Sequence, residues 1–445
     1  MSRFDSIFQK PTGEEAEAGP LISGAPGAFV GAIRSARRNL KRPKEVGELI
    51  PPAAVRQAQR LQHIVRMPRM LEEVYVRGYE NLPLRKESAP ILALSHKKFQ
   101  DVAAIVELIA GRPLDRFHDI TLIAQGGLFS AMYAYRDMVP AFCKRGAAAV
   151  ALRRPAVYFA HRLGNFLRQT FTDVNAYPVY REGRDIPISE EDFQDPNFAG
   201  PRITGRSYAD FVKYANRETL KSVLRVQKDM EERNRMFFIM PEGGYCHDGS
   251  VAPLQDFLGV FAFRKQAPTV FGALSYDELC PDRLGRISAF INLLPPSPPP
   301  QTKQAGVADF LDEGRRLLTE HTVILASHLI AAVVYEYLER DESFGIDDLR
   351  DAFDAHCCEL VAAAAEPSSA ITCDPGLAKP EYRADRLRRF LRYGSSRYFQ
   401  KDGRGRLRVS KANIEGFAHS ERTVNDIEWN RNHARHFYAA RDAAK

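Results

Sequence analysis

Apolar and polar residues change their spacing several times along the chain, and each change marks an expected element. Apolar residues recur every three or four positions between residues 51 and 71, which predicts an amphipathic helix that Pro68 should kink or split. Short apolar or alternating runs then predict strands. These runs lie at residues 74–76, 91–94, 121–124, 175–180, 237–240, 269–275 and 286–294.

Helical spacing fills the stretches between the expected strands. It covers residues 102–110, 128–135, 157–171 and 208–235. Strands that alternate with helices are typical of an α/β fold in which helices cover a central sheet. Residues 183–207 are rich in Gly, Pro, Asp and Ser, which predicts a surface insertion. We therefore expect a mixed central sheet flanked by helices.

A proline-rich break at residues 295–300 can continue neither a helix nor a central strand. Helical spacing returns at residues 306–320, 321–340 and 346–365, and a basic region that contains Arg386, Arg388 and Arg389 follows. These changes predict four regions. They are a flexible basic N-terminal tail (1–45), a helical lead-in (46–72), an α/β domain (73–300) and a C-terminal helical domain (301–445).

Composition excludes several classes of protein. The chain has 445 residues, of which 44% are hydrophobic, so it can bury a core and is not disordered throughout. Lys and Arg number 63 against 56 Asp and Glu, a net charge of +7. This mild excess suits an anionic substrate or an anionic membrane surface, and no nucleic-acid-binding motif accompanies it. We expect no nucleic-acid partner.

The cysteines and the apolar runs bear on location. The six cysteines contain no CxxC pair, so we expect reduced thiols and no metal site. The first twenty residues are polar and acidic, unlike a signal peptide. The most apolar run, residues 322–335, is too short to span a bilayer and predicts a buried core helix. We expect a cytoplasmic protein that at most rests on a membrane surface.

The sharpest chemical feature is a histidine and an aspartate at the end of an expected strand. His96 follows the apolar run 91–94, and Asp101 comes five positions later, where a helix should begin. Sites in α/β proteins form at this edge of the sheet. The aspartate could turn back to hold one ring nitrogen and leave the other as a general base. With 11 histidines in the chain, one such HxxxxD string is expected by chance.

A second feature is a glycine turn after the expected strand at residues 237–240. Pro241 and Glu242 lead into Gly243 and Gly244. Glycines allow a ligand close to the backbone and expose amide donors to an anion. The ordinary alternative is a simple strand-end turn.

Basic residues supply a third feature. Arg181 ends the expected strand 175–180, and a guanidinium forms a two-pronged contact with phosphate. A surface ion pair is its alternative. Lys97 and Lys98 could bind phosphate or the pyrophosphate of coenzyme A, and a solvated pair is equally consistent with the sequence. The run 246–248, Cys-His-Asp, could suggest a thiol nucleophile, although adjacent residues rarely form a catalytic triad.

These features, in this order, resemble the glycerolipid acyltransferase family, which acylates glycerol 3-phosphate or its lysophospholipid product. The family's first block is Asn-His-xxxx-Asp, against Ser95 to Asp101 here, and residues 74–83 resemble the strand and turn before that block. The second block ends in a strand arginine, matched by Arg181. The third is Phe-Pro-Glu-Gly-Thr-Arg-Ser, against residues 240–246, and the fourth is a short apolar strand, against residues 270–276.

The C-terminal part adds a further likeness. The string from Glu428 to His433 resembles the Tyr-Arg-Asn string near the end of large bacterial glycerol-3-phosphate and dihydroxyacetone-phosphate acyltransferases. Two departures from the family pattern stand out. Ser95 replaces the asparagine of the first block, and Gly244-Tyr245-Cys246 removes the threonine and arginine of the third. Arg264 and Lys265 are near enough in sequence to take that arginine's place.

The resemblance implies a glycerol-3-phosphate acyltransferase-like fold and an O-acyltransferase activity. His96 would deprotonate the acceptor hydroxyl, and Asp101 would orient the ring and stabilise the imidazolium. Gly243 and Gly244 would supply amide donors to the oxyanion, while Arg181 and a turn shaped by Glu242 would position glycerol 3-phosphate.

The implied donor is acyl-CoA or acyl carrier protein, and no cofactor is needed. Lysophosphatidate or dihydroxyacetone phosphate remains an alternative acceptor. A degenerate lipid-binding member of the family without activity also remains open.

Overall fold

The computed structural model describes residues 51–66, 71–98, 100–111, 113–126, 171–180, 207–367, 369–416 and 422–443, together with residues 158, 162, 168 and 169. Contacts within the chain divide it into two compact units. The first contains Ala58–Phe117 and Met240–Lys445, and the second contains Pro51–Gln57 and His118–Ile239. The helix α2 (Ala53–Arg66) begins in the second unit and continues into the first.

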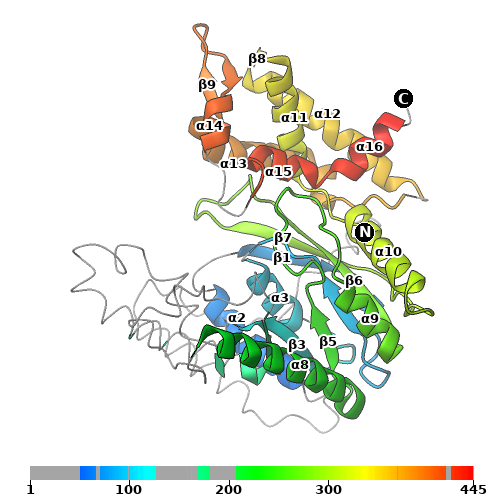
Figure 1. Cartoon of the computed structure of the whole chain (residues 1–445). Helices are drawn as coiled ribbons and strands as arrows, with labels where there is room; N and C mark the ends of the chain where they lie inside the picture. The colour runs from blue at the N-terminus through cyan, green and yellow to red at the C-terminus, as the bar shows by residue number, and fades with distance from the viewer. Residues whose placement is uncertain are drawn as a thin grey trace. The chain divides into compact units, whose positions relative to one another are not determined.

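The first unit is built on four strands of mixed direction (Figure 1). Their order is β1 (Leu71–Arg77), β7 (Ile287–Leu293), β6 (Thr269–Tyr276) and β2 (Ile91–Leu94). β1 runs parallel to β7 and β2 runs parallel to β6, whereas β6 and β7 are antiparallel. Every residue of β2, β6 and β7 is buried, as expected for apolar strands that are covered on both faces.

Helices flank these strands. α3 (Asp101–Ala110) contacts β1, while α9 (Asp256–Lys265) and α10 (Ala305–Glu320) contact each other, and α10 also contacts β6. Short 3₁₀ turns, η1 (Tyr79–Asn81) and η5 (Pro375–Ala378), connect elements.

The second unit has three parallel strands and one long helix. The strand order is β5 (Met236–Ile239), β3 (Ile120–Gln125) and β4 (Ala176–Val179). α8 (Tyr208–Arg233) contacts all three strands. The hydroxyl of Ser207 caps the first turn of α8 by accepting a hydrogen bond from the Asp210 amide at 3.2 Å.

The C-terminal part of the first unit is mainly helical. It contains α11 (Ala326–Arg340), α12 (Ile346–Ala365), α13 (Pro380–Tyr398), α14 (Lys411–Gly416), α15 (Asp426–Asn432) and α16 (Arg435–Ala443). A small antiparallel sheet joins them, in the order β8 (Ser343–Phe344), β10 (Leu407–Val409) and β9 (Phe399–Lys401). Their shared apolar core also includes Leu279 and Cys280, which follow β6.

The expected fold class is confirmed: the chain is a mixed α/β protein in which helices flank sheet strands. All seven expected strands are present, with ends that differ by at most a few residues. The expected core helix is also present, and residues 326–334 of α11 are all buried. No helix in the described part of the chain is long and apolar enough to cross a membrane.

Some expectations were wrong. The helix expected from residue 321 begins only at Ala326, because Ile324 is extended and forms a β-bridge with Cys373. The basic region around Arg386, which lies in the expected C-terminal helical region, is the helix α13. Arg386 is buried there, where its guanidinium Nε lies 3.3 Å from a carboxylate oxygen of Asp277. The sequence patterns gave no range for the small sheet or for α9, α13, α14, α15 and α16, although the last four lie in the expected C-terminal helical region.

Other expectations concern residues outside the described ones. These are the tail 1–45, Pro68, the helix at 128–135, most of the helix at 157–171 and the insertion 183–207 except its last residue.

Candidate active site

The loop after β2 is tied to the neighbouring strand before it reaches the histidine. The Ser95 amide donates to the carbonyl of Gly272 at 3.0 Å, and the Ser95 hydroxyl accepts from the Leu274 amide at 2.9 Å. Ser95 thus extends the pairing of β2 with β6 by one residue and fixes where His96 emerges. Ser95 therefore has a structural role in this chain.

His96 and Asp101 meet as the sequence predicts. His96 Nδ1 lies 2.7 Å from Asp101 Oδ2, and the His96 side chain is 21% exposed. When Nδ1 donates to the carboxylate, the neutral ring accepts a proton at Nε2. The pair therefore has the geometry of a general base with its orienting acid.

Asp101 is held by four donors. Its Oδ2 also accepts from the backbone amides of Lys97 at 2.7 Å and Lys98 at 3.1 Å, and its Oδ1 accepts from the hydroxyl of Tyr276 at 2.6 Å. Asp101 is also the first residue of α3, where the helix dipole favours a negative charge. The carboxylate is completely buried, so these contacts leave it a single orientation.

Tyr276 was not expected from the sequence. Burial, with the nearby charge of Asp101, raises the pKa of Tyr276, so its hydroxyl stays protonated and donates. Tyr276 can reach Asp101 because β2 and β6 are parallel, and their carboxyl ends therefore lie at one edge. Its only signal in the sequence is its place at the end of an apolar strand.

Glu242 connects the loop after β2 with the glycine turn. Its Oε1 accepts from the His96 amide at 2.7 Å, and its Oε2 accepts from the Ala252 amide at 3.1 Å. Burial raises the pKa of Glu242, while the charge of Lys97 and these two amides oppose that rise. Both carboxylate oxygens accept hydrogen bonds from backbone amides, so the buried Glu242 side chain stabilises the turn.

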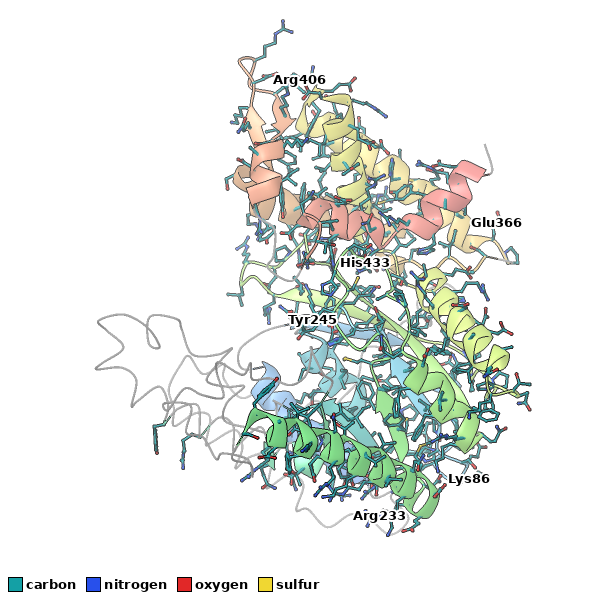
Figure 2. The ribbon with its side chains drawn as sticks, viewed as in Figure 1. Lys86, Arg233, Tyr245, Glu366, Arg406 and His433 are labelled. Carbon is teal, nitrogen blue, oxygen red and sulfur yellow. The ribbon has the colours of Figure 1, made fainter. Side chains whose placement is uncertain are left out.

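The glycine turn lies close to His96. Gly243 has a φ of +71°, which favours glycine, and its amide donates to the Met240 carbonyl at 3.2 Å. That amide is therefore engaged within the turn, while Gly244 is partly exposed beside it. The ring centroid of Tyr245, which is labelled in Figure 2, lies 4.4 Å from that of His96.

Lys97 is not solvated. It is only 2% exposed, and its ammonium has no hydrogen-bond partner among the described residues. Its charge acts on Glu242 and on two buried histidines of the C-terminal helices, His328 and His433. A substrate phosphate cannot reach this ammonium without a rearrangement of the residues that bury it.

Lys98 is committed to an ion cluster. Its ammonium lies 3.2 Å from a carboxylate oxygen of Glu278 and 4.8 Å from the centroid of the Tyr276 ring. Arg422 binds both oxygens of the same glutamate, at 2.9 and 2.8 Å. Burial raises the pKa of Glu278, but Lys98 and Arg422 outweigh it and lower that pKa to about 2. The solvated-pair alternative is therefore wrong for both lysines.

The remaining sequence candidates fall into two groups. Arg181 lies outside the described residues. Cys246 is buried, donates its thiol to the Ser250 carbonyl at 2.7 Å, and has a pKa that burial raises to about 11. A thiol held in its protonated form is a poor nucleophile, which argues against a catalytic Cys246.

No group of three or more His, Cys, Asp or Glu side chains in the described ranges could hold a metal ion.

Comparisons with known proteins add little. No family model matches the chain, and no curated protein matches it by sequence. Among solved structures, the chain is similar to the 1-acyl-sn-glycerophosphate (LPA) acyltransferase PlsC from Thermotoga maritima. The two are 14% identical, the match covers 65% of this chain and 88% of that chain, and the TM-score is 0.33. A likeness of this size decides neither the fold nor the activity of this chain.

Proposed function

We propose that the chain is an O-acyltransferase that moves a fatty acyl group from a thioester to an alcohol. The observation that carries the proposal is the His96–Asp101 pair, in which a partly exposed imidazole is oriented by a carboxylate with four donors. Such a pair can activate a hydroxyl without a metal or a redox group. The order of the sequence blocks around the pair matches that of the glycerolipid acyltransferases.

In the proposed mechanism the acceptor hydroxyl gives its proton to His96 Nε2 as its oxygen attacks the thioester carbonyl carbon. Asp101 stabilises the imidazolium that forms. The tetrahedral oxyanion would be met by backbone donors of the glycine turn, for which Gly244 is the candidate because the Gly243 amide is already engaged. The intermediate collapses, the carbon–sulfur bond breaks, and the leaving thiolate takes the proton from the imidazolium.

The proposed acceptor is glycerol 3-phosphate, in a step of phospholipid synthesis, with Arg181 as the phosphate ligand. Lysophosphatidate and dihydroxyacetone phosphate are the alternatives. The donor would be acyl-CoA or acyl carrier protein. The tyrosine that replaces the third-block arginine makes the acceptor the part of the proposal that most needs a test.

We further propose that the protein works in the cytoplasm at an anionic membrane surface. The basic N-terminal tail (1–45) lies outside the described residues, but α8 offers a described surface, which we name the outer face of α8. It combines two exposed leucines, Leu220 (62% exposed) and Leu224 (54%), with basic residues at helical spacing. The basic residues are Lys213, Arg217, Lys221, Arg225 and Lys228, all of them exposed. Such a mixture favours anionic lipid.

An acceptor panel tests the proposed function. Purified protein receives labelled acyl-CoA or acyl carrier protein with glycerol 3-phosphate, dihydroxyacetone phosphate, lysophosphatidate or a neutral alcohol. We expect ester formation with a phosphorylated acceptor. Ester formation with the neutral alcohol alone would overturn the proposed acceptor class. Acyl-CoA binding without ester formation on any acceptor would favour the degenerate lipid-binding alternative.

A further inference from the structure

The string Glu428–His433 lies in and just after α15, a short helix that is firmly anchored in the C-terminal part of the first unit. Ile427, Trp429 and Asn430 are each at most 1% exposed. α15 packs along α11, and the ring of His433 (labelled in Figure 2) stacks on that of His328 with centroids 4.8 Å apart. The position of α15 is therefore fixed by packing, and so are the positions of its hydrogen-bonding side chains.

Three donors from this part of the chain hold three consecutive carbonyls of the loop after the glycine turn. Trp429 Nε1 donates to the Cys246 carbonyl at 3.0 Å. The Thr423 amide donates to the His247 carbonyl at 3.0 Å. Asn432 Nδ2 donates to the Asp248 carbonyl at 2.7 Å. Each residue of loop 246–248 is thus fixed by the C-terminal segment.

The same loop forms a backbone hydrogen bond with the proposed catalytic histidine. The Cys246 amide donates to the His96 carbonyl at 3.0 Å. Cys246 therefore lies between His96 on one side and Trp429 on the other. Gly249 follows this loop directly and has a φ of +89°. A Cβ at that position would lie 2.1 Å from the Trp429 carbonyl oxygen. A side chain at position 249 would push α15 away from the loop.

A second connection between the C-terminal segment and the site consists of a cation–π contact and ion pairs. The Arg422 guanidinium lies 3.9 Å from the centroid of the Trp429 ring and binds Glu278, which also binds Lys98. The Lys98 amide in turn donates to Asp101. The C-terminal segment therefore reaches both members of the His96–Asp101 pair by separate routes.

We propose that Trp429 and Asn432 are positioning residues for the catalytic histidine, which they act on through loop 246–248. The inference rests on the proposed function and goes beyond it, because it gives the C-terminal string a role in the reaction. A general base works only within a narrow range of positions relative to the substrate. Loss of the Trp429 donor leaves the buried Cys246 carbonyl unpaired, so the loop and the His96 backbone become free to shift.

Hydrogen exchange tests the positioning without any assay of activity. Trp429→Phe keeps an aromatic ring but removes the Nε1 donor, and Asn432→Ala is the second variant in case Trp429→Phe does not fold. We expect faster exchange of amides in the segments 94–101 and 243–250. The matched control is Tyr438→Phe, which loses one hydrogen bond, to His356 at 3.0 Å, within the same helical part. Unchanged exchange in both segments in a folded variant would overturn the inference.

Kinetics then tests whether the shift acts through the histidine. We expect Trp429→Phe to lower kcat about tenfold, with both KM values within about twofold of wild type. In the Asp101→Asn variant the imidazole has already lost the carboxylate that orients it. Adding Trp429→Phe to that variant should therefore lower kcat by less than twofold. Equal losses in both backgrounds would mean that Trp429 serves stability alone. Absence of transfer by the wild type would instead overturn the proposed function and leave the exchange result to decide the inference.

Discussion

Single residues decide how the proposed site is assembled. Asp101 receives donors from His96, Lys97, Lys98 and Tyr276. Two of these donors are backbone amides that any residue would supply, while the histidine and the tyrosine are specific side chains. In the proposed mechanism the chemistry depends on His96, and Tyr276 supplies one of the two side-chain contacts that orient Asp101.

His96→Ala should remove acyl transfer and leave the fold intact. The side chain is partly exposed, and its loss opens no large cavity in the core, whereas a general base contributes about 10²–10⁴-fold to the rate. Turnover with the best acceptor of the panel, measured beside circular dichroism, checks this. A folded variant with wild-type turnover would remove His96 from the mechanism.

Tyr276→Phe should lower kcat about tenfold with little change in either KM, because Asp101 loses a hydrogen bond to a charged acceptor in a buried place. Tyr398→Phe is the matched control. Tyr398 is equally buried, and its hydroxyl has no hydrogen-bond partner within the described ranges. Equal effects of the two substitutions would show that Tyr276 contributes only packing.

At the scale of elements, the C-terminal helices carry two buried histidines, His328 and His433, and the partly buried His436. Burial lowers the pKa of His328 to about 3 and that of His436 to about 4, and it lowers the pKa of His433 as well. The Nε2 atoms of all three are buried without a hydrogen-bond partner in the described part of the chain. Protonation therefore has to displace them from the core.

The stability of the first unit should fall steeply as the pH drops below about 6.5. Each of these histidines binds a proton in the unfolded chain but not in the folded one, which costs about 1.4 kcal/mol per pH unit. Their stabilising effect is complete above the unfolded pKa and is lost as the pH falls toward the folded values. Thermal unfolding between pH 7.5 and 5 measures the slope. His436→Gln should reduce it, and an unchanged slope would contradict neutral burial of His436.

The outer face of α8 should contribute to binding of anionic vesicles. Reversing Lys213 and Arg217 to Glu removes attraction worth about 1 kcal/mol per basic residue and adds repulsion. Sedimentation with phosphatidylserine vesicles at low salt should show at least a tenfold loss of affinity. Lys303→Glu, at an exposed lysine of the first unit, is the control. Vesicle binding that changes neither with salt nor with the two charge reversals would exclude this face as the lipid contact.

At the scale of the whole chain, the segment after β6 joins the α/β part to the C-terminal helices. Asp277 Oδ1 accepts from the amide of Ser327 at 2.9 Å and from its hydroxyl at 2.6 Å, and the Leu279 amide donates to the same hydroxyl at 2.8 Å. Leu279 and Cys280 lie in the core of the C-terminal helices. Two residues that precede the proline-rich break, Leu279 and Cys280, therefore pack in a core formed by helices that follow it.

A chain that ends at residue 300 should not fold into a stable α/β domain. It would expose Leu279 and Cys280 and would leave the buried carboxylate of Asp277 without Ser327 and Arg386. Circular dichroism and size-exclusion chromatography of the truncated chain check this. A monomeric, cooperatively unfolding product would establish the break as a true domain boundary.

The sequence by itself determined the strands β1 to β7, six of the described helices and the His96–Asp101 pair. Those features depend on local spacing: continuous apolar runs make buried strands, and a histidine five residues before an aspartate at a helix start can close a short loop. The same reasoning could not find Tyr276, Glu278 or the contacts of Trp429. Tyr276 lies 175 residues along the chain from Asp101, and Trp429 lies 183 residues from Cys246.

Only the tertiary structure decided the state of the charged residues. In the sequence, Lys97 and Lys98 are equally consistent with a phosphate-binding pair and with a solvated pair. Lys97 is buried, whereas the Lys98 side chain is 12% exposed and its ammonium shares Glu278 with Arg422. Local pattern fixes which residues form an element and which face it buries. What packs against that face is set by chain segments that no local pattern connects, and burial, pairing and pKa follow from that packing.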